Sequence, residues 1–142
     1  ALDEYLTPMR DEVRRVDEWS SPATVLVVDD EPQIRLLLKR ILESRGMHVL
    51  TAEDGRQAIE MFRERSEEIA CVVLDLTMPH VGGDEAFVQM KQLRDDLPAI
   101  LISGYSKDHL QDSIEDLGFT GFLNKPLTAA ELLAEVRLAL GL

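Results

Sequence analysis

From Ala23 onward, short apolar runs alternate with amphipathic stretches that repeat at helical spacing. The apolar runs are rich in β-branched residues and predict strands at residues 24–28, 47–52, 69–74, 99–102 and 119–123. The amphipathic stretches predict helices at residues 32–45 and 55–67, from the Gly82-Gly83 loop to residue 94, and at residues 107–117 and 128–140. Thr128 and Glu131 have the spacing of a capping box at the start of the closing helix.

Five strand–helix units in series predict an α/β fold with one parallel sheet, because parallel strands need helical crossovers. Helices then cover both faces, which makes the sheet doubly wound. The first, third and fourth runs are continuously apolar, so we expect these strands at the centre of the sheet.

Residues 1–22 differ from the rest of the chain and form a predicted helical extension or linker. Apolar residues recur there at spacings of four and three, and Thr7 and Pro8 suit a helix start, so we expect a helix at about residues 8–19. Ser20 to Pro22 would end it. This helix could pack on its own domain, end a longer linker or form the contact of a homodimer.

Composition and charge narrow the class of protein. The 142 residues are 45% hydrophobic and 30% charged, which suits one globular domain with a short appendage. A net charge of −12 without a basic patch argues against nucleic-acid or membrane-surface binding. No membrane span or secretory signal is evident, and the lone Cys71 lies in an apolar run. These features predict a cytoplasmic protein with a buried, inert thiol.

Polar side chains stand where the predicted strands end, and ligands of open α/β sheets bind at that edge. They are Asp29, Asp30 and Glu31 after the first strand, Asp75 after the third, Ser103 after the fourth and Lys125 after the fifth. Taken one at a time, the acids could be helix caps or turn residues and Lys125 a solvated charge. Together, carboxylates on adjacent strand ends need a cation between them. Hard oxygen ligands suit Mg²⁺, and the combination predicts phosphoryl transfer.

Four motifs at these strand ends resemble those of the receiver domain of two-component response regulators and hybrid histidine kinases. They are Val28-Asp29-Asp30-Glu31-Pro32, Leu74-Asp75-Leu76-Thr77-Met78-Pro79 with Gly83, Ile102-Ser103-Gly104, and Asn124-Lys125-Pro126. The resemblance covers residues 23–142 and implies a flavodoxin-like fold of strand order 2-1-3-4-5.

The resemblance also implies roles for the residues at the acidic edge. Asp75 would be the phosphoacceptor, taking a phosphoryl group from a phosphohistidine. Asp30 would bind Mg²⁺ directly and Asp29 mainly through water, while Asp75 and the backbone carbonyl of Thr77 would complete the protein ligands.

Further roles concern the phosphorylated state. Ser103 and Lys125 would bind the phosphoryl group, and the Lys125–Pro126 bond would be cis. Phe122 matches an aromatic switch position that moves with Ser103, although it could also be a plain core aromatic. Thr77 and Tyr105 match positions that tune phosphate lifetime, and we expect Tyr105 to shield the acyl phosphate from water.

The partner implied is a histidine kinase or a histidine phosphotransfer protein. Leu36 falls on the outward face of the first helix of the domain, among Arg35, Lys39 and Arg40, and is the predicted docking residue. The domain would promote its own phosphorylation and dephosphorylation without being an enzyme in its own right, and its output would lie elsewhere.

Other interpretations compete with this one. A Mg²⁺-dependent aspartyl-nucleophile phosphatase would need a second Asp where Thr77 stands, and a flavodoxin would not place Asp29 to Glu31 at its phosphate loop. A scaffold that is not phosphorylated would not need the full set of site residues, all of which are present here. The helical lead-in and the end of the chain after the last predicted helix favour the receiver of a hybrid kinase over a stand-alone response regulator.

Overall fold

The computed structural model of the protein describes residues 19–104 and 116–142. Within them, five strands form a parallel sheet in the order β2-β1-β3-β4-β5. The strands are β1 (Thr24–Val28), β2 (His48–Ala52), β3 (Ile69–Asp75), β4 (Ala99–Ser103) and β5 (Gly121–Asn124). The order confirms the expected topology, with β1, β3 and β4 at the centre.

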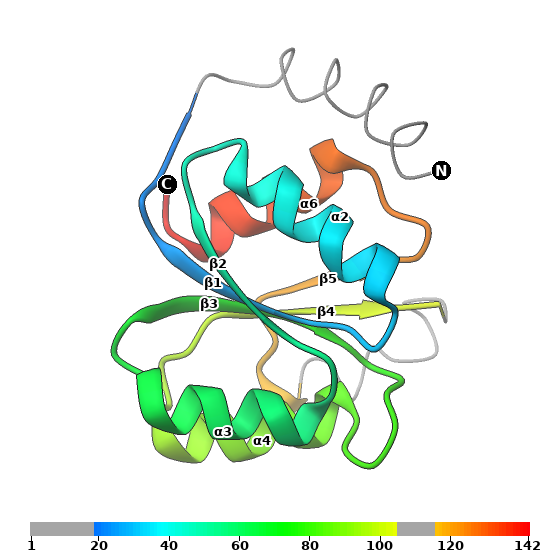
Figure 1. The fold of residues 1–142 in the computed structure, drawn as a ribbon. Helices are drawn as coiled ribbons and strands as arrows, with labels where there is room; N and C mark the ends of the chain where they lie inside the picture. The colour runs from blue at the N-terminus through cyan, green and yellow to red at the C-terminus, as the bar shows by residue number, and fades with distance from the viewer. Residues whose placement is uncertain (1–18, 105–115) are drawn as a thin grey trace.

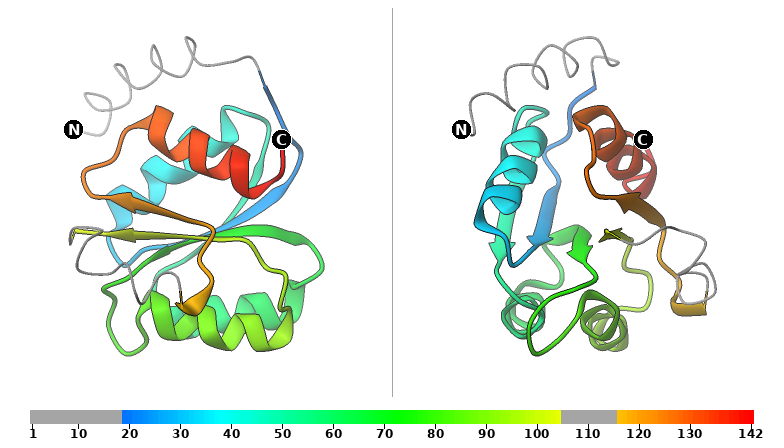
Figure 2. Two further views of the ribbon diagram at one scale, coloured as in Figure 1. Left: turned by 180° about the vertical axis from the view of Figure 1, so that it is seen from behind. Right: turned by 90° about the vertical axis from the view of Figure 1, so that its right-hand side faces the viewer.

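Helices cover both faces of this sheet. Those in the described ranges are α2 (Pro32–Glu43), α3 (Gly55–Arg65), α4 (Gly83–Leu93) and α6 (Ala129–Ala139). Figure 1 shows α2 and α6 on one face and α3 and α4 on the other, and the turned views of Figure 2 show the same layers. The helix expected at residues 8–19 and most of the one expected at 107–117 fall outside the described residues.

Side chains along each strand alternate between the two faces of the sheet and so divide the core into two clusters. In β1, Val25 and Val27 face α2 and α6, whereas Leu26 and Val28 face α3 and α4. Each side chain of a parallel strand therefore meets a helix, which explains why the central strands are apolar at successive positions. Cys71 is buried in the first cluster, as predicted.

Local signals determine where the helices begin and end. Thr128 and Glu131 form the predicted capping box. The first helix ends at Glu43, two residues earlier than predicted, and Gly46 follows with a φ of +86°. Arg45 lies in the turn that follows the helix and contacts Trp19.

The prediction for the last strand was wrong at its start. Pairing with β4 begins only at Gly121, opposite Ile100. Phe119 lies before the strand, with its ring 4.3 Å from that of Phe87 in α4. Its apolar character therefore reflects packing on a helix, which the pattern of apolar residues alone cannot distinguish from a strand.

The chain enters the domain through contacts of Trp19. The Arg45 guanidinium lies 5.5 Å from the centre of the Trp19 ring and donates a hydrogen bond of 3.1 Å to the Trp19 carbonyl oxygen. Trp19 also packs on the core beneath α2 and α6. Trp19, four residues before the predicted boundary at Ala23, is thus already in contact with the domain. None of the described helices is both long enough and apolar enough to cross a membrane.

Candidate functional site

The parallel register brings the ends of β1 and β3 side by side. Val28 pairs with Leu74, so Asp29 and Asp75 follow at neighbouring positions on the same edge of the sheet. Ser103 ends β4 opposite Asn124 of β5, which precedes Lys125. The topology therefore collects the predicted site residues at one edge.

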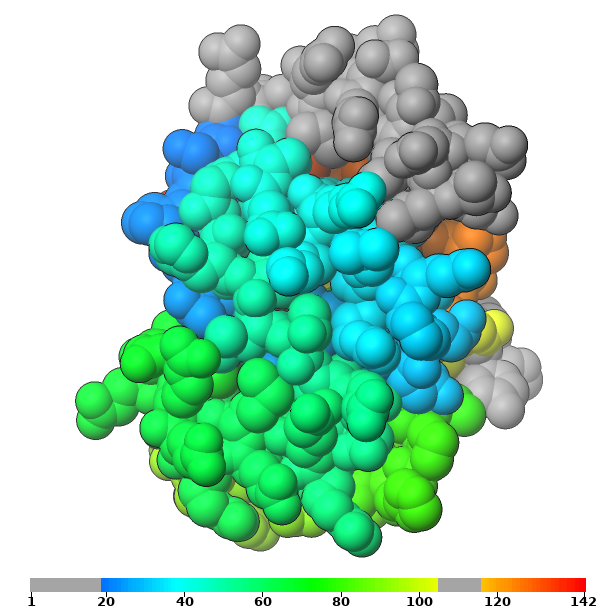
Figure 3. All heavy atoms as spheres, in the orientation of Figure 1, coloured from blue at the N-terminus to red at the C-terminus, as the bar shows by residue number. Residues whose placement is uncertain are grey.

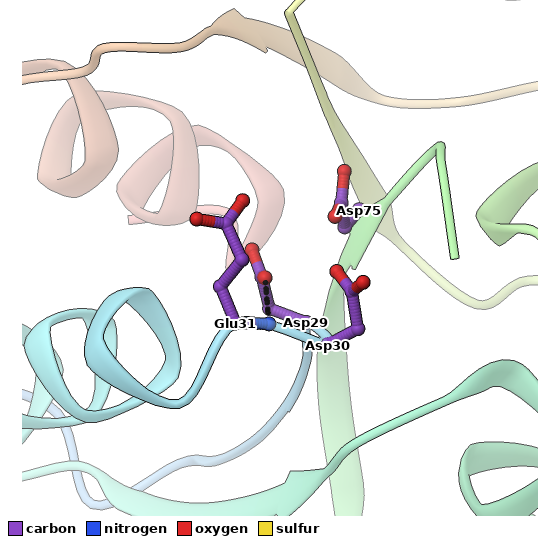
Figure 4. Close-up of side chains that lie close together, drawn as sticks. All are labelled: Asp29, Asp30, Glu31 and Asp75. Atoms are coloured by element: carbon purple, nitrogen blue, oxygen red, sulfur yellow. Dashed lines mark hydrogen bonds between the residues drawn. The ribbon is translucent and has the colours of Figure 1, made fainter. Parts of the chain in front are cut away.

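Four carboxylates meet at this edge, as Figure 4 shows. Asp29, Asp30, Glu31 and Asp75 each offer an oxygen, and these oxygens all lie within 4.8 Å of one another. Asp29 and Asp75 are buried, whereas Asp30 and Glu31 are exposed. The cluster thus has a buried floor and an open side from which a ligand can approach.

The ammonium group of Lys125 reaches three of these carboxylates. Its Nζ lies 3.0 Å from Glu31 Oε1, 3.1 Å from Asp29 Oδ2 and 3.3 Å from Asp75 Oδ2. Among the described residues, Lys125 is the cation that forms ion pairs with these carboxylates. The site therefore keeps an excess of negative charge, and charges held this closely repel one another when solvent is excluded.

The pKa values of the site follow from burial and charge. Burial raises the pKa of Asp75 to about 6, and the neighbouring Asp29 charge adds to the rise, although Lys125 opposes it. Burial likewise raises the pKa of Asp29, against the hydrogen bond from the Glu31 amide and the charge of Lys125. Burial alone would lower the pKa of Lys125, but the hydrogen bond to Glu31 and the charges of Asp29 and Asp75 raise it.

These residues suit a small divalent cation. Among the residues described, Asp29 Oδ2 is a buried oxygen that accepts no hydrogen bond, and the Lys125 ammonium lies 3.1 Å from it. The four acids offer carboxylate oxygens, which are among the ligands that hard cations such as Mg²⁺ prefer. A cation would satisfy the buried oxygen and relieve the repulsion that raises the pKa of Asp75.

The loop after β1 holds Asp29 by its backbone and side chain. The Glu31 amide donates to Asp29 Oδ1 at 2.9 Å, and Arg35 Nη1 donates to the Asp29 carbonyl oxygen at 2.7 Å. The Asp29 amide donates to the Ala52 carbonyl oxygen at 3.2 Å. The first acid is therefore fixed before any ligand binds.

The loop after β3 holds Asp75 in a similar way. The Thr77 amide lies 3.4 Å from Asp75 Oδ1, and the Leu76 amide donates to the Ile102 carbonyl oxygen at 2.8 Å. Gly83 packs directly against the Asp75 backbone, where a Cβ would collide with the carbonyl oxygen. The glycine in the predicted motif is thus needed for this close approach.

Lys125 is positioned by the end of β4. Its amide donates to the Ser103 carbonyl oxygen at 2.8 Å, and the bond between Lys125 and Pro126 is cis, as expected. Ser103 itself is buried at the same edge. The fourth and fifth strand ends therefore supply a hydroxyl and a cation beside the acids.

Two predicted residues lie outside this cluster and one cannot be placed. Phe122 is half-buried in β5, opposite Leu101. Leu36 is exposed on α2, as predicted. Tyr105 falls outside the described residues.

Two residues that contact the site had no predicted role. Glu31 pairs with Lys125, and Arg35 holds the Asp29 backbone. The run of three acids before Pro32 could have indicated a role for Glu31. Its partner, Lys125, is distant in the sequence and could not be inferred from that run. Arg35 gave no such signal, because the spacing alone placed it on the outward face of a helix.

Comparison with known proteins identifies the family. The model of the response regulator receiver domain matches residues 25–137. The sensor kinase CckA of Brucella abortus is 33% identical over 125 residues, which are 88% of this chain and 13% of that protein. The response regulator MprA of Mycolicibacterium vanbaalenii is 36% identical over 118 residues, or 82% of this chain and 49% of that protein. The chain thus spans half or less of these curated relatives.

Solved structures agree with the sequence matches. A receiver-domain protein from Clostridium thermocellum superposes with a TM-score of 0.78 and 29% identity, covering 84% of this chain and 94% of that one. The CheX–CheY complex of Borrelia burgdorferi, which contains BeF3 and Mg²⁺, gives 0.79 and 30% identity, with coverages of 82% and 88%. The chain therefore belongs to the response regulator receiver domains, which are the signalling modules of two-component systems.

Proposed function

We propose that Asp75 accepts a phosphoryl group from a phosphohistidine on a histidine kinase or a histidine phosphotransfer protein. The observation that carries this proposal is the placement of the buried Asp75 carboxylate 3.3 Å from the Lys125 ammonium and within 4.8 Å of three further carboxylate oxygens. A nucleophile, a fixed cation and a set of hard oxygen ligands are the parts that phosphoryl transfer needs.

The transfer is a displacement at phosphorus. One Asp75 carboxylate oxygen forms the new O–P bond, the N–P bond of the phosphohistidine breaks, and its electron pair stays on the imidazole nitrogen. The product is an aspartyl phosphate. With a pKa of about 6, Asp75 is ionised at neutral pH and so able to attack.

Mg²⁺ would be held by Asp30 directly, by Asp29 mainly through water, and by Asp75 and the backbone carbonyl of Thr77. When bound, the ion neutralises charge on the phosphoryl oxygens. The buried Asp29 Oδ2, which faces the Lys125 ammonium and accepts no hydrogen bond among the described residues, supports this assignment. The residues of the chain orient Asp75 through the Thr77 amide and fix Asp29 through Glu31 and Arg35.

Ser103, Lys125 and Phe122 would respond to phosphorylation of Asp75. Ser103 and Lys125 bind the phosphoryl oxygens, and the half-buried Phe122 ring turns inward as Ser103 moves. Phe122 has no hydroxyl, so this movement depends on packing alone. Thr77 and Tyr105 set how quickly water removes the phosphoryl group.

Leu36 would be the anchor for the phosphohistidine partner. It is 38% exposed on α2, the helix that begins beside the acidic cluster. Lys39 and the exposed Arg40 follow on the same helix, on a domain that is otherwise acidic. Figure 3 shows the outer face of α2, in cyan, open to solvent.

The wider context is proposed from the relatives. A sensor kinase and several response regulators both match this chain, and we favour the receiver of a hybrid histidine kinase over a stand-alone response regulator. The receiver unit is residues 23–142, with residues 1–22 as its extension, and we place it in the cytoplasm. It promotes its own phosphorylation and dephosphorylation.

Phosphorylation by a small donor tests the proposal. Wild-type protein incubated with acetyl phosphate and Mg²⁺ should gain one phosphoryl group by intact-mass spectrometry, and the adduct should be stable in acid and labile in base. Asp75→Asn should gain none, whereas Asp95→Asn, which changes an exposed aspartate after α4, should behave as wild type. No adduct on the wild-type protein, or an equal adduct on Asp75→Asn, would overturn it.

A further inference from the structure

Glu31 occupies the N-cap position of α2 without capping the helix. Residues at this position ordinarily use a short side chain to accept a hydrogen bond from the first turn. The Glu31 side chain makes no such bond, and its Oε1 instead accepts one of 3.0 Å from Lys125. The Glu31 side chain therefore pairs with Lys125 in the acidic cluster and does not cap the helix.

Glu31 differs from the other two partners of Lys125 in exposure. Its side chain is 60% exposed, whereas those of Asp29 and Asp75 are 0% and 6% exposed. Ion pairs that face water are weak and exchange readily. Lys125 is thus held on its outer side by a carboxylate that a better anion can replace.

The backbone of Glu31 is nonetheless fixed. Its amide donates to Asp29 Oδ1 at 2.9 Å, and its carbonyl oxygen accepts from the Arg35 amide at 3.0 Å in the first turn of α2. Figure 4 shows the Glu31 side chain rising from the β1–α2 loop next to that of Asp29. The fixed backbone therefore keeps the Glu31 carboxylate at the exposed side of the acidic cluster.

We infer that Glu31 is a positioning and specificity-determining residue for phosphorylation, which disfavours small, doubly negative phosphoryl donors. Its carboxylate repels such donors as they approach Asp75 and holds Lys125 until a phosphoryl group displaces it. A protein donor overcomes the barrier because docking supplies binding energy away from the phosphoryl group. The inference rests on the proposed function and names a determinant of donor choice within it.

The size of the effect follows from Coulomb's law. A donor with two negative charges about 7 Å from the Glu31 carboxylate is disfavoured about threefold to eightfold at ionic strengths of about 0.1 M and below. The effect disappears near 1 M salt, where the Debye length falls to about 3 Å. A donor with one negative charge is disfavoured less.

Glu31→Gln tests the inference, because it removes the charge and keeps an oxygen that can accept from Lys125. The second-order rate constant for phosphorylation is measured at saturating Mg²⁺ with acetyl phosphate, a dianion, and with phosphoramidate, which carries less negative charge. With acetyl phosphate we expect a gain of about threefold or more at low salt, which shrinks as salt is added. The gain with phosphoramidate should be smaller.

A control variant isolates the role of the charge. Glu43→Gln makes the same change at the last residue of the same helix and should leave both rates unchanged. Equal gains for both donors, or a gain that salt does not reduce, would overturn the inference.

Mg²⁺ affinity, measured by calorimetry, distinguishes a metal ligand from a charge that repels donors. We expect Glu31→Gln to weaken Mg²⁺ binding by about threefold to eightfold at low salt, and by less as salt is added, since it removes only a nearby charge. A loss of tenfold or more would overturn the inference and make Glu31 a metal ligand. If wild-type protein takes no phosphoryl group at all, the proposed function fails as well; if it does and Glu31→Gln matches it, only this inference fails.

Discussion

Lys125 Nζ lies 3.3 Å from Asp75 Oδ2, although fifty positions separate the two residues in the chain. The two strand ends that carry them are not neighbours, since β4 lies between β3 and β5. The long lysine side chain spans this gap along the edge of the sheet. It thereby becomes the shared counterion of Asp75, Asp29 and Glu31.

Removal of this counterion should destabilise the metal-free protein. Lys125→Met leaves two buried carboxylates without their cation. We expect a loss of about 1–3 kcal/mol in the free energy of unfolding at pH 8, less than for a fully buried pair because Lys125 is partly exposed. Urea unfolding in the presence of a chelator measures it. Lys39→Met, on the outer part of α2, serves as the control. Equal losses for both variants would show that the ion pairs of Lys125 do not contribute to the free energy of unfolding.

The raised pKa of Asp75 predicts a defined pH dependence. Between about pH 4, the unfolded value, and about pH 6, the folded protein retains a proton that the unfolded chain has released. The metal-free protein should therefore lose stability as the pH rises through this window. Asp75→Asn should remove this loss and be more stable than wild type by about 1–3 kcal/mol at pH 8, with little difference at pH 4.

Urea unfolding at both pH values, with a chelator present, checks this prediction. The sign matters more than the size, because most substitutions of a buried residue destabilise a protein. A lower stability of Asp75→Asn at pH 8 would mean that the repulsion inferred for the cluster does not exist.

Gly83 should be intolerant of a side chain despite standing at the start of a helix. Alanine ordinarily favours helices over glycine by about 1 kcal/mol, but a Cβ here would strike the Asp75 carbonyl oxygen. We expect Gly83→Ala to destabilise the protein by about 1–3 kcal/mol and to weaken Mg²⁺ binding. Gly104→Ala is a suitable control, because its Cβ would meet none of the described atoms within 4 Å. A stabilised Gly83→Ala variant would refute the steric argument.

Leu36 should matter for transfer from a protein donor and not for a small one. If it anchors the partner, Leu36→Ala should slow transfer from the phosphorylated histidine kinase about fivefold or more. Phosphorylation by acetyl phosphate should not change, nor should stability by more than about 0.5 kcal/mol. Leu138→Ala removes an exposed leucine from α6 as the matched control. Unchanged transfer in Leu36→Ala would remove this residue from the interface.

Much of the fold could be predicted because its local signals agree with its topology. The apolar strands, the Thr128–Glu131 capping box and the acids at strand ends are all local features. The strand order itself came from family resemblance, since periodicity does not distinguish one order of parallel strands from another. Phe119 was misassigned because an apolar residue that packs on α4 resembles the start of a strand.

The contacts that the sequence did not reveal depend on side chains from distant segments. The pair of Glu31 with Lys125 forms only once five strands are in register, and the contact of Trp19 with Arg45 joins residues 26 positions apart. Both involve long side chains whose positions depend on the surrounding packing. Spacing along the chain carries no information about either contact.

The central claim is that Asp75 itself carries the phosphoryl group, and borohydride reduction tests it most directly. Borohydride converts an aspartyl phosphate to homoserine, which peptide mapping can locate. After incubation with acetyl phosphate and Mg²⁺, we predict homoserine at position 75 and at no other aspartate, and none when Mg²⁺ is omitted. Homoserine at Asp29 or Asp30, or its absence from position 75 in a protein that has gained a phosphoryl group, would contradict the account.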